Sequence, residues 1–217
     1  WIQAYESVYT HNKPKRQSVY VPFHKIQPNA MQKAALAGIQ KLRDDGQDRG
    51  LLISATGTGK TYLSAFDVLK MQPRRFLFVV HREIIVKSAR DSYVRIGINP
   101  ADTGLLTGHD KELDKPYIFA TIQTLSQDEI LHTFAPDTFD YIVIDEVHHG
   151  GAATYQKVIR YFQPKFLLGM TATPERSDDF DIYALFHHHI AYEIRLHDAL
   201  EENMLVPFHY HGISEIT

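Results

Sequence analysis

The chain has 217 residues, 44% of them hydrophobic, which is enough for one large domain or two small ones around a buried core. It contains no cysteine, which excludes disulfides and thiolate zinc sites and favours a reducing, cytoplasmic setting. The net charge of −3 excludes the strongly basic footprint of a protein that coats nucleic acid, so any such contact must be local.

Residues 1–25 mix aromatic side chains with lysine, arginine and proline, and they show no sustained helical or strand period. We interpret them as a lead-in segment to one domain that spans residues 26–217. The first residues lack the basic and apolar regions of a secretion signal, and no apolar stretch approaches the roughly 20 residues that span a bilayer. No membrane association is therefore expected.

A helix is expected to begin at Asn29, a typical N-cap residue, because Met31, Ala35, Ile39 and Leu42 share one helical face. Asp44-Asp45-Gly46 should end it. After this helix, short apolar runs alternate with segments of helical character. The runs lie at 51–55, 76–81, 117–121, 141–145 and 166–170, and the helical segments near 60–71, 83–95, 123–131 and 152–163.

This alternation predicts an α/β fold in which crossover units build a mainly parallel sheet with helices on both faces. The runs at 76–80 and 141–144 are apolar throughout, as expected for strands covered on both sides. Functional loops should then lie at the carboxyl ends of the strands. From about residue 177 the chain becomes acidic and aromatic, with a helix-like stretch at 197–203, and we interpret it as an exit towards another domain.

The segment from Ser54 to Thr61 follows the first apolar run and predicts a phosphate-binding loop, although Ser54 replaces the usual first glycine. In such a loop the backbone around Thr56, Gly57, Thr58 and Gly59 points N–H groups at phosphate oxygens. Lys60 would meet the β- and γ-phosphates of ATP, and the Thr61 hydroxyl would reach Mg²⁺. The alternative is a glycine-rich bend that only packs a helix against a strand.

Asp145 and Glu146 end the fourth apolar run, 84 positions after Thr61. An acidic residue at this place holds magnesium from the other side, which is the role expected for Asp145. Neighbouring side chains cannot both face one atom, so Glu146 is expected to act on the attacking water as a base. The alternative is that both acids merely cap the following helix. Together with the loop, the pair predicts an ATPase with Lys60, Asp145 and Glu146 as its catalytic residues.

Asp145-Glu146-Val147-His148 resembles the DEAH-type box of superfamily 2 helicases and translocases, and the segment Ser54–Thr61 resembles that superfamily's first motif. Thr171-Ala172-Thr173-Pro174 is similar to the third motif. This resemblance implies a RecA-like fold, and it implies that His148, Thr171 and Thr173 couple the ATP site to the nucleic-acid site.

Three further segments fit the same resemblance, which covers residues 26–176 in the family's order. His81-Arg82 resembles motif Ia, and the segment Thr121–Leu125 resembles the next nucleic-acid-facing motif. The resemblance therefore implies nucleic-acid contacts at Arg82 and Thr121, and it implies that Gln32 reads adenine. Within the superfamily, the chain is similar to restriction-enzyme-like and excision-repair-like DNA translocases. DNA is expected as the partner by this analogy, and RNA is compatible with the same motifs.

Each of these roles has a plainer alternative. Gln32 can be an ordinary exposed helix residue, and Arg82 can belong to a solvated charged face with Lys87 and Arg90. Threonine hydroxyls often satisfy strand-end backbone groups, which would explain Thr121 without nucleic acid. His187-His188-His189 suggests a metal site, but consecutive residues on an extended segment point to opposite faces and cannot converge on one ion.

The chain is therefore expected to be the ATP-binding half of a DNA helicase or translocase. No Gln-x-x-Gly-Arg-x-x-Arg segment occurs in it, so the arginine that stabilises the transferred phosphate should come from a second RecA-like domain. The isolated chain should then bind ATP and hydrolyse it weakly. Two alternatives remain open: the motor part of a restriction or phage-defence nuclease, and a nucleotide switch without motor activity.

Overall fold

The computed structural model describes residues 26–174 and 181–194. The predicted lead-in segment, most of the predicted exit from residue 177 and the helix-like stretch at 197–203 lie outside the described residues. No helix among the described residues has the length and apolar character needed to cross a membrane.

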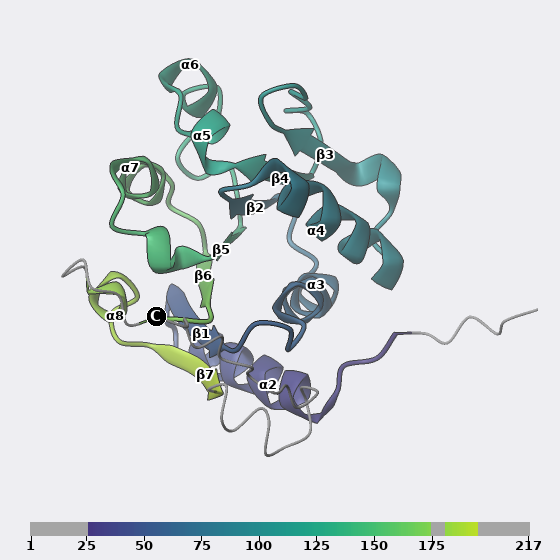
Figure 1. Ribbon diagram of the computed structural model, residues 1–217, viewed down its shortest axis with the longest axis vertical. Coiled ribbons are helices and arrows are strands. Elements are labelled where there is room, and N and C mark those ends of the chain that lie inside the picture. Colours follow the sequence, from purple (N-terminus) through teal and green to yellow (C-terminus); the bar gives the residue numbers. More distant parts are fainter. Residues whose placement is uncertain (1–25, 175–180, 195–217) are drawn as a thin grey trace, which may run out of the picture.

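The described residues build one seven-stranded sheet whose strand order is β3-β4-β2-β5-β6-β1-β7. Every pairing between these strands is parallel. The strands are β1 (Arg49–Ser54), β2 (Phe76–Val80), β3 (Thr103–Leu106), β4 (Tyr117–Thr121), β5 (Tyr141–Asp145), β6 (Phe166–Thr171) and β7 (Ile190–Ile194). Figure 1 shows the sheet running through the centre of the molecule between two layers of helices. The predicted fold, a RecA-like α/β domain with a parallel sheet, is confirmed.

The two helical layers differ in helix length. One face of the sheet carries the three long helices, and the other carries shorter ones (Figure 1). The first layer consists of α2 (Ala30–Asp44), α3 (Lys60–Met71) and α4 (Glu83–Ile96), and the second of α5 (Ile122–Leu125), α6 (Asp128–Leu131), α7 (Ala153–Tyr161) and α8 (Ile182–Leu185). Two 3₁₀ helices are also present in the described part of the chain: η1 (Pro100–Asp102) between α4 and β3, and η2 (Val147–His149) between β5 and α7.

The uniformly apolar strands are explained by the two layers. Because side chains alternate along a strand, Phe76 and Phe78 pack into the core beneath α2, α3 and α4, while Leu77 and Val79 pack into the core beneath the shorter helices. All five residues of β2 are buried, as are all five of β5. A strand covered in this way exposes functional side chains only where it ends.

Helix α2 begins as predicted from the sequence. The Asn29 side chain accepts a hydrogen bond from the Gln32 N–H at 2.8 Å, and the Gln32 side chain accepts one from the Asn29 N–H at 3.0 Å. This reciprocal capping box satisfies two backbone donors that the helix leaves unpaired. The chain leaves the helix at Gly46, whose φ of 76° suits glycine.

A buried charge network joins α2 and α3 to the sheet. The Arg43 guanidinium donates two hydrogen bonds to the Asp67 carboxylate, which also accepts the Tyr141 hydroxyl at 2.7 Å. The Arg43 guanidinium lies over the Phe166 ring, 4.6 Å from its centroid. Since α3 follows the phosphate loop directly, this network fixes the second half of the helix whose first residues adjoin the loop.

Two strands of the sheet, β3 and β7, were not predicted from the sequence. Strand β3 has four residues, one of them glycine, and β7 is a partly exposed edge strand without a continuous apolar run. The helix expected at 123–131 is divided into α5 and α6 by Ser126-Gln127. The assumption of an extended segment at His187 and His188 was also wrong, because both have a left-handed backbone (φ 53° and 59°) in the turn before β7.

Candidate nucleotide site

The phosphate loop connects β1 to α3 through two glycines with positive φ, Gly57 at 86° and Gly59 at 82°. Gly59 is the N-cap of α3, and no side chain caps this end of the helix. The first N–H groups of α3 are therefore left for another acceptor, and the helix dipole adds positive potential at the same place. This combination suits a phosphate group.

Ser54, which replaces the usual glycine, forms a hydrogen bond inside the loop. Its hydroxyl lies 2.6 Å from the Thr58 hydroxyl, which donates to the Ala55 carbonyl at 2.7 Å. Thr58 is thus turned inward and is almost completely buried. Any contact of Thr58 with a nucleotide would come from its backbone.

Lys60 lies along the loop that precedes it. Its ammonium group donates to the carbonyls of Ser54 at 2.7 Å and Ala55 at 3.1 Å. Burial lowers the pKa of Lys60, while Asp145 and Glu146 oppose this shift. The side chain therefore places a positive charge between the glycine-rich loop and the two acids.

Asp145 is the last residue of β5 and is only 7% exposed. Burial raises the pKa of its carboxyl group to about 6, although Lys60 acts in the opposite direction. Its Oδ1 atom accepts the Glu146 N–H at 2.9 Å, which fixes the carboxylate relative to the backbone. The Thr61 hydroxyl lines the same cavity. Carboxylate and hydroxyl oxygens are hard ligands, so the pair fits the magnesium ion expected from the sequence.

Glu146 adopts a left-handed backbone conformation with φ of 54°, which is unusual for a residue other than glycine. Its Oε2 atom lies 2.5 Å from the His81 Nδ1 atom, at the end of the neighbouring strand β2. Both atoms are buried and lack the alignment of a hydrogen bond, and the contact is an ion pair when the imidazole carries a proton.

The third-motif segment meets the DEAH-type box through one side chain. The His148 Nδ1 atom lies 3.2 Å from the Thr171 hydroxyl, which is fully buried at the end of β6. The same hydroxyl accepts the Thr173 N–H at 3.1 Å. The residues expected to couple the two sites are thus in direct contact.

These elements surround one cavity of about 420 Å³. Its lining comes from the phosphate loop, the end of β5 and the segment after β6, which are distant in sequence and adjacent in the sheet. The lining residues are Thr56, Gly57, Gly59, Lys60, Thr61, Asp145, Glu146, His148, Ala172 and Thr173. A pocket of this size with a cation, two acids and a helix N-terminus can hold a nucleoside triphosphate.

Other predicted residues lie outside the lining. Gln32 is buried, and its amide donates to the Gly59 carbonyl at 3.2 Å, so it braces the phosphate loop. Arg82 is exposed at the start of α4. The Thr121 hydroxyl is buried and donates to the Thr124 hydroxyl at 2.9 Å, which gives it a local structural partner.

The sequence motifs did not assign a role to His81 or His149. Their rings meet edge to face at 5.0 Å, and the ring of His149 lies 4.3 Å from that of His148. The contact of His81 with Glu146 follows from the order of the strands, in which β2 lies beside β5. Because Val79 of β2 pairs with Ile144 of β5, the residues two positions further on, His81 and Glu146, must be neighbours.

Comparison with known proteins identifies the family. The family model described as "Type III restriction enzyme, res subunit" matches residues 25–176. The chain belongs to this family.

Relatives of this chain include a restriction-enzyme subunit and a DNA translocase. The Type I restriction enzyme EcoAI endonuclease subunit of Escherichia coli is 30% identical over 178 residues, which are 76% of this chain and 21% of the relative. The DNA 3'-5' translocase XPB2 of Sulfurisphaera tokodaii is 27% identical over 134 residues, 61% of this chain and 28% of the relative. The chain thus spans less than a third of either relative.

Solved structures show the same fold. A nuclease-deletion mutant of the Type ISP restriction-modification enzyme LlaGI, in complex with a DNA substrate mimic, matches with a TM-score of 0.64 and 18% identity, over 82% of this chain and 21% of that one. The Pyrococcus furiosus Hef helicase domain matches with a TM-score of 0.62 and 21% identity, over 76% of this chain and 37% of that one. At these identities the likeness shows the fold of this chain.

Proposed function

We propose that this chain is the ATP-binding half of an ATP-dependent DNA helicase or translocase, and that the whole protein couples ATP hydrolysis to movement on nucleic acid. The observation that supports this most directly is the convergence of three separate segments on one cavity. The phosphate loop, Asp145-Glu146 and the segment after β6 all line it. A binding site for a nucleotide alone would not require the third segment.

The roles of the site residues follow from their positions. Lys60 would bind the β- and γ-phosphates, and the backbone from Thr56 to Gly59 would enclose them. Thr61 and Asp145 would hold Mg²⁺, which neutralises charge on the phosphates when bound. Glu146 would take a proton from the attacking water, since its carboxylate lines the same cavity without serving the metal. His148, Thr171 and Thr173 would couple the ATP site to the nucleic-acid site.

DNA as the partner is supported by the relatives rather than by a basic surface. The XPB2 relative is named as a DNA translocase, and the LlaGI structure was solved with a DNA substrate mimic. With a net charge of −3, this chain should hold DNA through a few local contacts. We propose Arg82 and Thr121 for this role, of which exposed Arg82 has the better placement. A cytoplasmic location is part of the same proposal and is supported by the absence of cysteine.

A second RecA-like domain is needed to complete the proposed site. The cavity described above offers Lys60 as its cationic side chain, whereas transfer of a phosphoryl group generally also uses an arginine from a neighbouring domain. Such arginines contribute on the order of 10³–10⁵ in rate, so we expect weak hydrolysis by this chain in isolation.

A second candidate function is the motor part of a restriction or defence nuclease. It is favoured by the family match and by the 30% identity to the EcoAI endonuclease subunit. The two candidates share the ATP site and differ in the remainder of the whole protein. Incubation of the whole protein with long duplex DNA and ATP separates them, because only the second predicts cleaved DNA.

The test of the proposed function is the ATPase activity of the whole protein, measured without nucleic acid and with single-stranded DNA, duplex DNA or RNA. We expect DNA to raise the turnover number. Stimulation by RNA alone would reassign the substrate. If none of the three changes turnover, the motor function is wrong and a nucleotide switch takes its place.

A further inference from the structure

The carboxylate of Glu146 is held by a residue outside the nucleotide-binding motifs. The His81 Nδ1 atom lies 2.5 Å from the Glu146 Oε2 atom, and both atoms are buried although about a fifth of the His81 side chain and a third of the Glu146 side chain remain exposed. No aligned hydrogen bond to either atom exists among the described residues. His81 is therefore the group that sets the position of this carboxylate oxygen.

The backbone of Glu146 makes this contact more informative. A left-handed conformation is strained for glutamate and persists only where the surroundings impose it. One restraint is the bond from the Glu146 N–H to Asp145, and the ion pair with His81 is a second. The first restraint acts on the backbone of Glu146 and the second on its side chain. Together they fix the position of the proposed base relative to the cavity.

His81 is itself oriented by a row of rings. Its imidazole meets His149 edge to face at 5.0 Å, and His149 lies against His148 at 4.3 Å. His148 contacts the Thr171 hydroxyl. The row connects the ends of β2, β5 and β6, so a continuous set of contacts joins His81 to the third-motif segment as well as to Glu146.

His81 also stands at the entry to α4. The next residue, Arg82, is exposed, and its carbonyl accepts the N–H groups of Ile85 and Val86 in the first helical turn. A phosphate bound by Arg82 would therefore act on the backbone directly beside His81. Arg82 on this surface is thus connected to the proposed base through its neighbour His81, which contacts Glu146.

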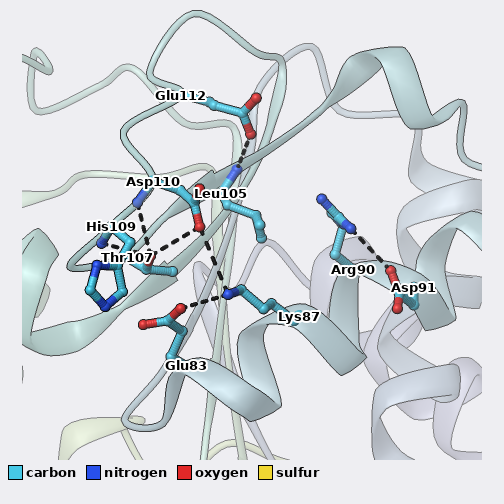
Figure 2. A network of polar contacts seen from close by, with 9 residues as sticks. All are labelled: Glu83, Lys87, Arg90, Asp91, Leu105, Thr107, His109, Asp110 and Glu112. Atoms are coloured by element: carbon cyan, nitrogen blue, oxygen red, sulfur yellow. Dashed lines mark hydrogen bonds and ion pairs between the residues drawn. The ribbon is translucent and has the colours of Figure 1, made fainter.

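Figure 2 shows that the first turn of α4 is also attached to a neighbouring loop. Lys87 donates to Glu83 at 2.7 Å and lies 4.0 Å from Asp110. Asp110 in turn is bonded to Thr107, whose hydroxyl accepts the Asp110 N–H at 3.1 Å. Polar contacts thus join the start of α4 to the loop after β3, next to Arg82 in the chain.

We propose that His81 is a positioning residue that sets the Glu146 carboxylate and makes ATP turnover depend on nucleic-acid contact at the start of α4. This inference rests on the proposed function, because it concerns how the same ATP site is regulated. His81 is not among the residues that line the cavity, and its closest polar contact is with Glu146, so its effect on turnover is expected to act through Glu146.

The first test compares His81→Ala, His81→Asn and His81→Gln in the whole protein. The readouts are the affinity for ATP and the ratio of turnover with DNA to turnover without it. We expect ATP affinity to stay within about twofold and the ratio to fall about tenfold in His81→Ala, a size typical of coupling between sites. The Asn amide nitrogen stands near the position of Nδ1, so His81→Asn should keep most of the ratio, while His81→Gln should not.

His132→Ala is the matched control, since His132 is an exposed histidine on the opposite helical layer, just after α6. It should leave the ratio unchanged. An unchanged ratio in His81→Ala would overturn the inference. If the unmodified protein shows no stimulation at all, the proposed function fails instead, and the inference is then judged by the second test.

The second test needs no turnover. Ring nitrogens of histidine are labelled with ¹⁵N in this chain, and the His81 signal is identified by its absence from His81→Asn. We expect the His81 Nδ1 signal to shift in Glu146→Gln and to stay unchanged in Glu129→Gln, a control on the exposed surface of α6. Identical His81 signals in the unmodified chain and in Glu146→Gln would show that the contact does not form in solution, and the inference would be wrong.

Discussion

The two ends of β5 carry acidic residues in opposite circumstances. Asp140, which directly precedes the strand, accepts the N–H groups of Arg74 at 2.9 Å and Arg75 at 3.3 Å, and its carboxylate lies 2.8 Å from the Lys165 ammonium. Burial alone would raise the pKa of Asp140, but Lys165, Arg74 and the Arg75 N–H lower it to about 2. At the other end, burial raises the pKa of Asp145 to about 6.

This difference separates residues that stabilise the fold from residues that serve the site. At the amino end of β5, Asp140 and the Tyr141 hydroxyl have partners within the protein. At the carboxyl end, burial raises the pKa of Asp145, and the Glu146 Oε2 atom accepts no aligned hydrogen bond from the described residues. Groups left in this state cost stability and are typical of sites that complete their interactions with a ligand.

The largest effect is expected from the network below Tyr141. Asp67→Asn leaves the Arg43 guanidinium buried without its full charge partner, and removing one member of a buried pair costs about 3–5 kcal/mol. Urea unfolding should show this loss in the free energy of unfolding. Asp45→Asn, in an exposed pair with Lys41, is the control and should change stability by less than about 1 kcal/mol. Equal effects of the two changes would remove the distinction between these pairs.

At the carboxyl end, Lys60→Ala should weaken ATP binding by about 1.5–3 kcal/mol, roughly 10- to 150-fold, because a hydrogen-bonded charge on the phosphates is lost. Equilibrium binding of ATP to this chain measures it. Lys41→Ala, an exposed lysine on α2, should leave the affinity unchanged. Unaltered affinity in Lys60→Ala would mean that Lys60 is only a helix residue.

The Asp140 carboxylate predicts a pH dependence of stability. Its pKa is lowered from 3.8 to about 2 on folding, so its contribution is fully present above about pH 4 and is lost as the pH falls towards 2. Asp140→Asn should therefore lower the free energy of unfolding by about 1–2 kcal/mol at pH 7, and this difference should shrink below pH 4. Urea unfolding of both chains between pH 3 and pH 7 measures the difference, and a constant value across this range would contradict the assignment.

The smallest effect is expected at the proposed nucleic-acid surface. Arg82→Ala should weaken DNA binding by the whole protein uniformly across sequences and reduce the slope of log affinity against log salt by about one. The measurement is a salt titration of DNA affinity. Arg160→Ala, on the exposed face of α7, is the control. An unchanged slope in Arg82→Ala would indicate that Arg82 belongs to a solvated helix end.

The sequence predicted most of the central sheet because its strands are buried on both faces. The run Phe76–Val80 is apolar throughout, and Tyr141–Asp145 carries a charged residue only at its end. The positions of the glycines indicated the phosphate loop. The edges were less predictable. Strand β7 is held by pairing with β1 rather than by an apolar pattern of its own, and the helical period of 123–131 hid a break between two short helices.

The same distinction applies to the site. Lys60, Thr61, Asp145 and Glu146 stand in motifs whose spacing indicates their chemistry, and the structure brings them to one cavity. The contact of His81 with Glu146 depends on β2 lying beside β5, an order that the chain sequence does not specify. For Gln32, the sequence suggested adenine recognition, and the structure adds a bond to the Gly59 carbonyl that no motif indicates.

Glu146→Gln in the whole protein tests the central claim most directly, because it changes one atom of the proposed base and leaves the phosphate loop and Asp145 in place. We measure ATP affinity together with turnover in the presence of DNA. The account predicts that affinity stays within about twofold while turnover falls by about 10²–10⁴, the usual contribution of a general base. Normal turnover in Glu146→Gln, with ATP bound as tightly as before, would contradict it.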